Sequence, residues 1–279
     1  MLIGTFVYLS TRFFMKILKR LVTFILALLV LFVGLAVVVP IVYKKEIVTL
    51  IKEDINNNVN AQVQFSEDVS ISLLKSFPNL NIKISDVHIT DSTLFKADTL
   101  LKCATIETTI ALKPLLAGHQ IDIAYVALDK PYVQLVTRQN SNNWDILKTE
   151  STDSNALHLS ADFNNIQVDN GQLIYKDSSN TTHVDLNNIT GSFKGNYADN
   201  IFDVKSDFIC ENAFVSYDHI PYVNHIPITT EAITSIDLIS DTYAFKENLF
   251  TVGTLEVTAS GGIQYDKDSV EIDIDYTSN

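Results

Sequence analysis

The sequence predicts a mainly β protein in which an N-terminal transmembrane helix and a short amphipathic helix precede an antiparallel β-sheet. Three observations predict this class: an uncharged apolar run near the N-terminus, a stretch of helical period after it, and strict apolar–polar alternation beyond residue 60. Hydrophobic residues make up 47% of the 279 residues, so the chain is not expected to be disordered.

The apolar run "LVTFILALLVLFVGLAVVV" fills residues 21–39 without a charge. As a helix it would be about 28 Å long, close to the roughly 30 Å hydrocarbon core of a bilayer. Four basic residues and no acidic one precede it, which predicts a cytoplasmic N-terminus (1–20), an anchor (21–42) and a body outside. A cleaved signal peptide is the alternative, because Gly34-Leu35-Ala36 has small residues at cleavage spacing; the run passes straight through this triplet.

The segment 43–60 is predicted to form a short amphipathic helix. Its apolar residues recur at helical spacing, with charged residues on the opposite side, and they are Ile47, Leu50, Ile51, Ile55 and Val59. The helix could cap the first strands or lie on the membrane surface, and the pattern favours neither role.

Beyond this helix the chain alternates with a period of two, which is typical of a sheet with one apolar and one solvated face. Leu80, Ile82 and Ile84 alternate with polar residues, and so do Val270, Ile272, Ile274 and Tyr276. Short intervals between the runs favour antiparallel pairing. Turns are predicted at Phe77-Pro78-Asn79, Asp129-Lys130-Pro131, Asp169-Asn170-Gly171, Lys176 to Asn180, and Gly261-Gly262.

Three segments, 81–91, 121–136 and 165–177, each read as strand, Asp-centred turn, strand, which suggests a loosely repeated hairpin. The polar stretch 149–156 is the best candidate for a linker. We therefore expect a first β region at 61–148 and a second at 157–279.

Charge and residue types exclude several functions. Residues 1–45 carry six basic and no acidic residues, so 14 basic residues remain against all 33 acidic ones, and a nucleic-acid partner is not expected. Cys103 and Cys210 are expected to be two buried, inert thiols. His219 and His225 do not have metal-site spacing. No catalytic, metal-binding or cofactor-binding residue stands out, so we expect neither an enzyme nor a cofactor.

Five short motifs, in this order, resemble the N-terminal region of the AsmA family. They are Ser76-Phe77-Pro78-Asn79-Leu80, Asp98-Thr99-Leu100, Leu112 to Gly118, Leu128-Asp129-x-Pro131, and Asn142-Asn143-Trp144-Asp145-Ile146. The similarity extends from about Met15 to the end. No single motif is specific, and their order and spacing carry the resemblance.

The resemblance implies a protein anchored in the inner membrane whose elongated, curved sheet forms a groove in the periplasm. It implies phospholipid transport or envelope homeostasis, with membrane lipids, the inner membrane and other envelope proteins as partners. A scaffold that binds outer-membrane assembly proteins through its sheet edge is the alternative. Family members are usually longer, so we expect the chain to be a fragment, truncated at its C-terminus, or a short member.

The expected apolar lining of the groove comes from four alternating runs. It comprises Leu80, Ile82, Ile84, Ile121, Ile123, Tyr125, Val133, Leu135, Val270, Ile272 and Ile274. Alternation alone does not distinguish an open groove from a closed sandwich whose apolar faces cover each other.

Overall fold

A computed structural model describes most of the chain. The described residues are 20–34, 59–91, 98–111, 123–138, 141–144, 165–179, 181–198, 201–237, 242–266 and 269–279, with isolated positions at 38, 42, 45, 48–49, 52, 113, 146 and 240. They contain one continuous helix, 20–34, and fourteen strands. The strands are β1 (Ala61–Gln64), β2 (Ser70–Ser72), β3 (Leu80–Asp91), β4 (Thr99–Ile110), β5 (Ile123–Asp129), β6 (Tyr132–Arg138), β7 (Ser141–Asn142), β8 (Ile166–Asp177), β9 (Thr182–Ala198), β10 (Ile201–Tyr217), β11 (Ile220–Asp237), β12 (Thr242–Val252), β13 (Leu255–Asp266) and β14 (Ser269–Ser278).

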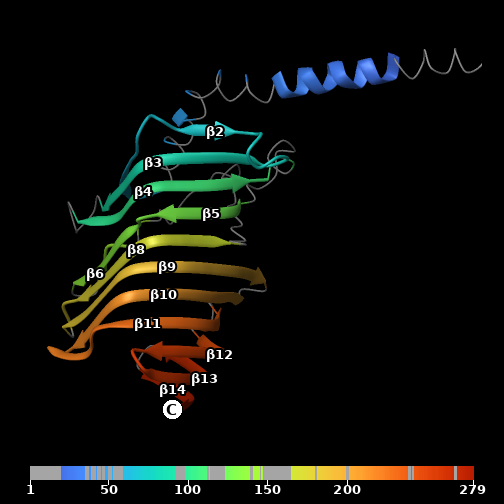
Figure 1. Ribbon diagram of the computed structural model, residues 1–279. Helices are drawn as coiled ribbons and strands as arrows, with labels where there is room; N and C mark the ends of the chain where they lie inside the picture. The colour runs from blue at the N-terminus through green and yellow to red at the C-terminus, as the bar shows by residue number, and fades with distance from the viewer. Residues whose placement is uncertain are drawn as a thin grey trace, which may run out of the picture.

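All fourteen strands belong to one sheet, which runs from β1 to β14 in nearly sequential order (Figure 1). Every pair of described strands in substantial contact is also a hydrogen-bonded pair, so no second sheet packs on this one within the described chain. Only ten hydrophobic side chains are buried among the described residues. The mainly β class is confirmed, and the described strands form a single layer.

The sheet is mixed, so the expectation of purely antiparallel pairing was wrong at one place. β5 and β6 do not fold back on each other. Both pair with β4 on one side, and both run parallel to β8 on the other. Parallel neighbours need a long crossover, and the chain between β7 and β8 provides it. Residues 149–156, the expected linker, lie in this crossover and outside the described residues.

Two of the predicted turns lie inside continuous strands instead, and a third is a bend between two consecutive strands. The chain runs on from β5 into β6 through Asp129-Lys130-Pro131, and β8 continues through Asp169-Asn170-Gly171. Gly261-Gly262 lies within β13. Turns do occur before β3, at Phe77-Pro78, and after β8, at Ser178-Ser179.

A line of five positive-φ residues crosses the sheet, and two of them, Lys130 and Asn170, lie where turns were wrongly predicted. The registers of the flanking residue pairs place Asp86 (φ 54°) opposite Ala104. The same reasoning places Ala104 opposite Lys130 (φ 49°). Lys130 is beside Asn170 (φ 57°) in the parallel register. Asn188 of β9 and His225 of β11 continue the line at irregular register positions. We call these five residues (Asp86, Lys130, Asn170, Asn188 and His225) the crease.

The crease changes the phase of the apolar alternation. In β3 the apolar residues are Ile82 and Ile84 before Asp86, but Val87 and Ile89 after it. A residue in the left-handed region interrupts the two-residue repeat and bends the strand, as a β-bulge does. The longer strands accordingly bend near one end in Figure 1. Of the three segments predicted as repeated hairpins, 81–91 and 165–177 therefore lie along single bent strands, and the described part of 121–136 forms β5 and β6, which follow each other through a bend.

The N-terminal expectations are only partly covered by the described residues. The helix 20–34 includes most of the apolar run, and its large apolar side chains from Leu21 to Val33 are 40–66% exposed. Among the described residues, no helix combines the length and apolar character needed to cross a membrane. Positions 45, 48, 49 and 52 of the expected amphipathic helix are helical, and most of that segment lies outside the described residues.

Candidate functional site

On one side of the crease, the sheet has one apolar and one polar face. Directly opposed residues of neighbouring strands point to the same side of a sheet, so hydrogen-bonded partners can be followed from strand to strand. On one face, two rows of partners run from β3 to β13 or β14, and the rows are two residues apart along each strand. The first row is Ile82, Thr108, Val126, Ile166, Phe193, Ser206, Ala232, Asn248, Ala259 and Tyr276, and the second is Ile84, Ile106, Leu128, Val168, Gly191, Phe208, Thr230, Phe250 and Val257. We call these two rows the apolar face.

The row between them points to the opposite side and is mostly polar. It comprises Lys83, Glu107, Ala127, Gln167, Ser192, Asp207, Glu231, Leu249, Thr258 and Thr277, which we call the polar face. Lys75 lies 2.6 Å from the carboxylate of Glu107, and Asn81 donates a hydrogen bond of 3.0 Å to the same oxygen. Hydrogen bonds from these two side chains lower the pKa of Glu107.

The apolar face is the less exposed of the two faces, although no strand covers it within the described chain. In β10, Ser206 and Phe208 are half-buried, whereas Lys205 and Asp207 are exposed. The rings of Phe193 and Phe208 stack with their centroids 5.8 Å apart. The apolar side chains therefore shield one another within a single layer and remain partly accessible to a guest molecule.

Two hollows of the sheet lie on the side of the polar face. One of about 740 Å³ spans β3 to β10 and is lined by Lys83, Glu107, Gln167 and Asp207, among others. Another, of about 660 Å³, spans β10 to β14 beside Glu231. The sequence led us to expect a hollow with an apolar lining. A twisted sheet, however, is concave along one diagonal on each face, so hollows also form over the polar side chains.

The structure brings together much of the lining predicted from the sequence. Ile82 and Ile84 are in the two rows of the apolar face. Leu80 lies on the same side, with Ile110 opposite it and Ile123 next along. At the far end, Val270, Ile272, Ile274 and Tyr276 occupy every second position of β14. Tyr276 is the last residue of the first row, so the other three share its side.

Other predicted lining residues lie elsewhere. Tyr125 is opposite Thr109, and its hydroxyl donates a 2.7 Å hydrogen bond to Gln167, so it belongs to the side of the polar face. Val133 and Leu135 are half-buried beyond the crease, beside Leu173 and Tyr175 of β8. Ile121 lies outside the described residues.

The sequence prediction missed the middle of the apolar face. In β5 it is Val126 and Leu128 that lie on this face, and not the predicted Tyr125. Phe193 and Phe208 extend the face into β9 and β10. The signal was present in part, because Val126 and Leu128 alternate in the same way as Ile82 and Ile84. It was obscured by the assumption that Asp129-Lys130-Pro131 ends a strand.

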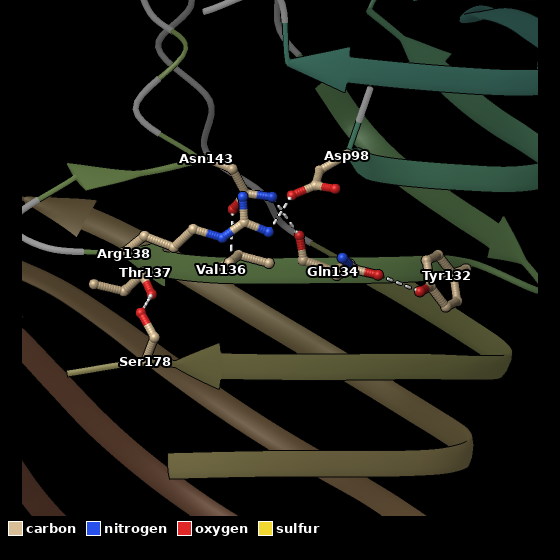
Figure 2. Close-up of polar contacts among 8 residues, drawn as sticks. All are labelled: Asp98, Tyr132, Gln134, Val136, Thr137, Arg138, Asn143 and Ser178. Atoms are coloured by element: carbon tan, nitrogen blue, oxygen red, sulfur yellow. Dashed lines mark hydrogen bonds and ion pairs between the residues drawn. The ribbon is translucent and has the colours of Figure 1, made fainter. Parts of the chain in front are cut away.

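The Asn143 motif of the family resemblance has a structural role, which Figure 2 shows. The side chain of Asn143 is 1% exposed; its Oδ1 accepts a hydrogen bond from the backbone N–H of Val136 (2.8 Å). Its Nδ2 donates to the carbonyl oxygen of Gln134 (2.8 Å). Both backbone groups belong to β6, beyond the point where β6 pairs with β4. Asn143 thus extends the pairing that β7 makes with the end of β6.

A residue of a second motif, Asp98, contacts the same end of β6. Arg138, at the end of β6, lies 3.1 Å from the carboxylate of Asp98, which immediately precedes β4 (Figure 2). On the other side of β6, Ser178 donates a hydrogen bond to the carbonyl oxygen of Thr137. These contacts position backbone segments, and they form no cluster of reactive groups.

The two thiols are free and buried, as expected. Burial raises the pKa of Cys103 and of Cys210, which disfavours the reactive thiolate. Among the described residues, no group of His, Cys, Asp and Glu side chains could hold a metal ion.

Comparison with protein families gives a match to most of the chain. A family model described as "AsmA family" matches residues 14–251, which is well over half of the chain. No curated protein and no solved structure is significantly similar to it. The order of motifs, the large β-sheet and the family match agree, and the chain belongs to the AsmA family.

Proposed function

We propose that this protein is a non-enzymatic envelope protein that holds the acyl chains of phospholipids along its apolar face. The apolar run 21–39 anchors it in the inner membrane, with the N-terminus in the cytoplasm and the sheet in the periplasm. Its partners are membrane lipids and other envelope proteins. Family membership supports this proposal, and so does a large sheet with a separate apolar side.

The observation that carries the proposal is the continuity of the apolar face. Nine strands (β3, β4, β5 and β8 to β13) each contribute at least one apolar side chain to it, in a sheet that no second layer covers within the described chain. Moving a methylene group from water to an apolar surface gains about 0.8 kcal/mol, so a long acyl chain needs only a diffuse apolar wall. A lipid could therefore slide along the face without a specific site for each position.

A photo-cross-linking pair in β10 tests this. Phe208 and Asp207 are adjacent but point to opposite sides, so a benzophenone amino acid at either position samples one face only. We expect phospholipid adducts, detected by mass spectrometry after irradiation of membranes, at position 208 and not at position 207. Equal labelling at both positions, or none at 208 in a folded protein, would contradict the proposal.

A protein-binding scaffold is the second candidate, and β14 is the observation that favours it. Among the described strands, β14 pairs only with β13, so its outer edge has unpaired backbone groups to which a partner's strand could add. Native mass spectrometry of the purified protein separates the two candidates. Bound phospholipid supports the first, whereas a cross-linked protein partner without lipid supports the second.

A further inference from the structure

The loop between β2 and β3 carries large apolar side chains that the sheet does not cover. In this loop, residues 73–79, the side chain of Phe77 is 60% exposed and that of Leu74 is 52% exposed. The loop's one charged side chain, Lys75, is paired with Glu107 at 2.6 Å. An exposed apolar loop whose charge is compensated is unusual in contact with water and suits an apolar environment.

The helix 20–34 supplies the clue to that environment. Phe32 packs its ring edge-on against the ring of Phe77, with the centroids 5.5 Å apart. The large apolar side chains of this helix are 40–66% exposed from Leu21 to Val33, so protein does not bury them. Whatever apolar medium surrounds the helix therefore also surrounds Phe77.

The position of Phe32 indicates how far the loop enters that medium. Phe32 is seven positions before Val39, the end of the uncharged run, which would amount to about 10 Å in a helix. Segments that lie at a membrane interface bury their apolar side chains about 5–10 Å deep. In contact with Phe32, Phe77 would lie at the deep end of this range, among the acyl chains of the outer leaflet.

We propose that the β2–β3 loop inserts Leu74 and Phe77 into the periplasmic leaflet of the inner membrane beside the anchor. This proposal rests on the proposed function, because it takes the apolar run as the anchor. Leu80, which begins β3, follows Phe77 by three residues and lies on the side of the apolar face. The loop therefore forms the entrance through which acyl chains pass from the bilayer to Leu80 and Ile82.

Tryptophan quenching in the full-length protein tests the proposal. The single tryptophan, Trp144, is first replaced by phenylalanine, which retains a ring beside Tyr175. Phe77→Trp is then introduced, and the protein is reconstituted in bilayers of phosphatidylcholine brominated on its acyl chains. We expect most of the emission to be lost and the residue to be protected from acrylamide in water. Leu74→Trp provides a second reading if Phe77→Trp does not fold.

The matched control is Leu249→Trp, which introduces tryptophan at an exposed apolar position on the polar face of β12. We expect acrylamide, and not brominated lipid, to quench it. The proposal is overturned if tryptophan at 77 or 74, in a folded protein, behaves like tryptophan at 249. Ile272→Trp tests the proposed function separately, because it reports lipid on the distant end of the apolar side whatever the loop does.

Discussion

Asn143 pairs with Val136 as a strand residue would, although part of this pairing comes from its side chain. Its Oδ1 accepts from the N–H of Val136 at 2.8 Å, and its own backbone N–H donates to the carbonyl of Val136 at 3.1 Å. β7 pairs with the end of β6 at Thr137 and Arg138, and Asn143 carries this pairing on to Val136.

Asn143→Ala should destabilise the protein by about 2 kcal/mol, because it leaves a buried N–H and a carbonyl of β6 without partners. Asn143→Asp should cost at least as much at neutral pH, since it retains the acceptor for Val136 but buries a carboxylate with one oxygen against the carbonyl of Gln134. Urea unfolding followed by Trp144 fluorescence measures both. Asn142→Ala is the control, because its side chain accepts an exposed bond from the N–H of Trp144 and should cost far less.

Glu107→Gln should remove a pH-dependent contribution to stability. The pKa of Glu107 is lowered in the folded state by hydrogen bonds from Lys75 and Asn81, so its contribution is present at neutral pH. It is lost as the pH falls below the ordinary value of about 4.5 and through the folded pKa. The urea midpoints of wild type and variant should therefore converge at low pH, with a difference at neutral pH of at most about 1 kcal/mol.

The partner variant Lys75→Met provides a check on the origin of this effect. In a double-mutant cycle, Glu107→Gln should change the pH dependence less when Lys75 is already absent. An unchanged pH profile of Glu107→Gln in the presence of Lys75 would argue against the pairing seen in the structure.

Gly191→Ala should destabilise the protein by more than about 2 kcal/mol, because there is no room for a Cβ atom. A Cβ at this position would overlap the carbonyl oxygen of Asp207 and the Cα and Cβ atoms of Phe208 in the neighbouring strand β10. Thermal unfolding followed by circular dichroism measures the loss. Gly34→Ala, where a Cβ would meet nothing within 4 Å, should leave the melting temperature unchanged.

Substitutions at Asn170 should reveal the backbone strain of the crease. Its φ of 57° lies in the left-handed region, which a β-branched residue adopts only at a cost of about 1–2 kcal/mol. Asn170→Val should therefore lower the unfolding free energy by about this amount, whereas Asn170→Gly should be neutral or slightly stabilising. If both variants had the same stability, the left-handed conformation would not be present in solution.

Ile272→Lys should reduce the amount of phospholipid that co-purifies with the protein without unfolding it. The side chain is 64% exposed, so the charge can be accommodated, but it lies on the side that the lipid is proposed to occupy. Asp273→Lys adds a lysine at the next residue on the opposite side and should leave bound lipid unchanged. Phosphorus analysis of the purified protein, together with a circular dichroism spectrum, compares the two.

The sequence was sufficient to predict the sheet and the outer parts of its apolar side. Alternation over residues 80–84 and 270–276 indicated which residues share a side, because neither of these runs is interrupted; in β3 the interruption comes only at Asp86. It failed for Tyr125, where an irregular register between β4 and β5 changes which residues share a side. Irregularities of this kind depend on the neighbouring strand, which a single alternating run does not reveal.

The turn predictions failed for a related physical reason. Asp, Asn, Lys-Pro and Gly-Gly favour backbone conformations that occur both in turns and at bends within strands. At Asp129-Lys130-Pro131 the local preference for a positive φ was real, since Lys130 has a φ of 49°. The partners on both sides, β4 and β8, keep the chain extended and convert a potential reversal into a bend.

The curvature of the sheet is thus encoded in backbone torsion angles at a few positions, and none of the five crease residues is part of the apolar face. Leucine, isoleucine, valine and phenylalanine can replace one another along that face while the bend stays the same. The width and texture of that surface can therefore change by substitution without a change in the architecture that presents it.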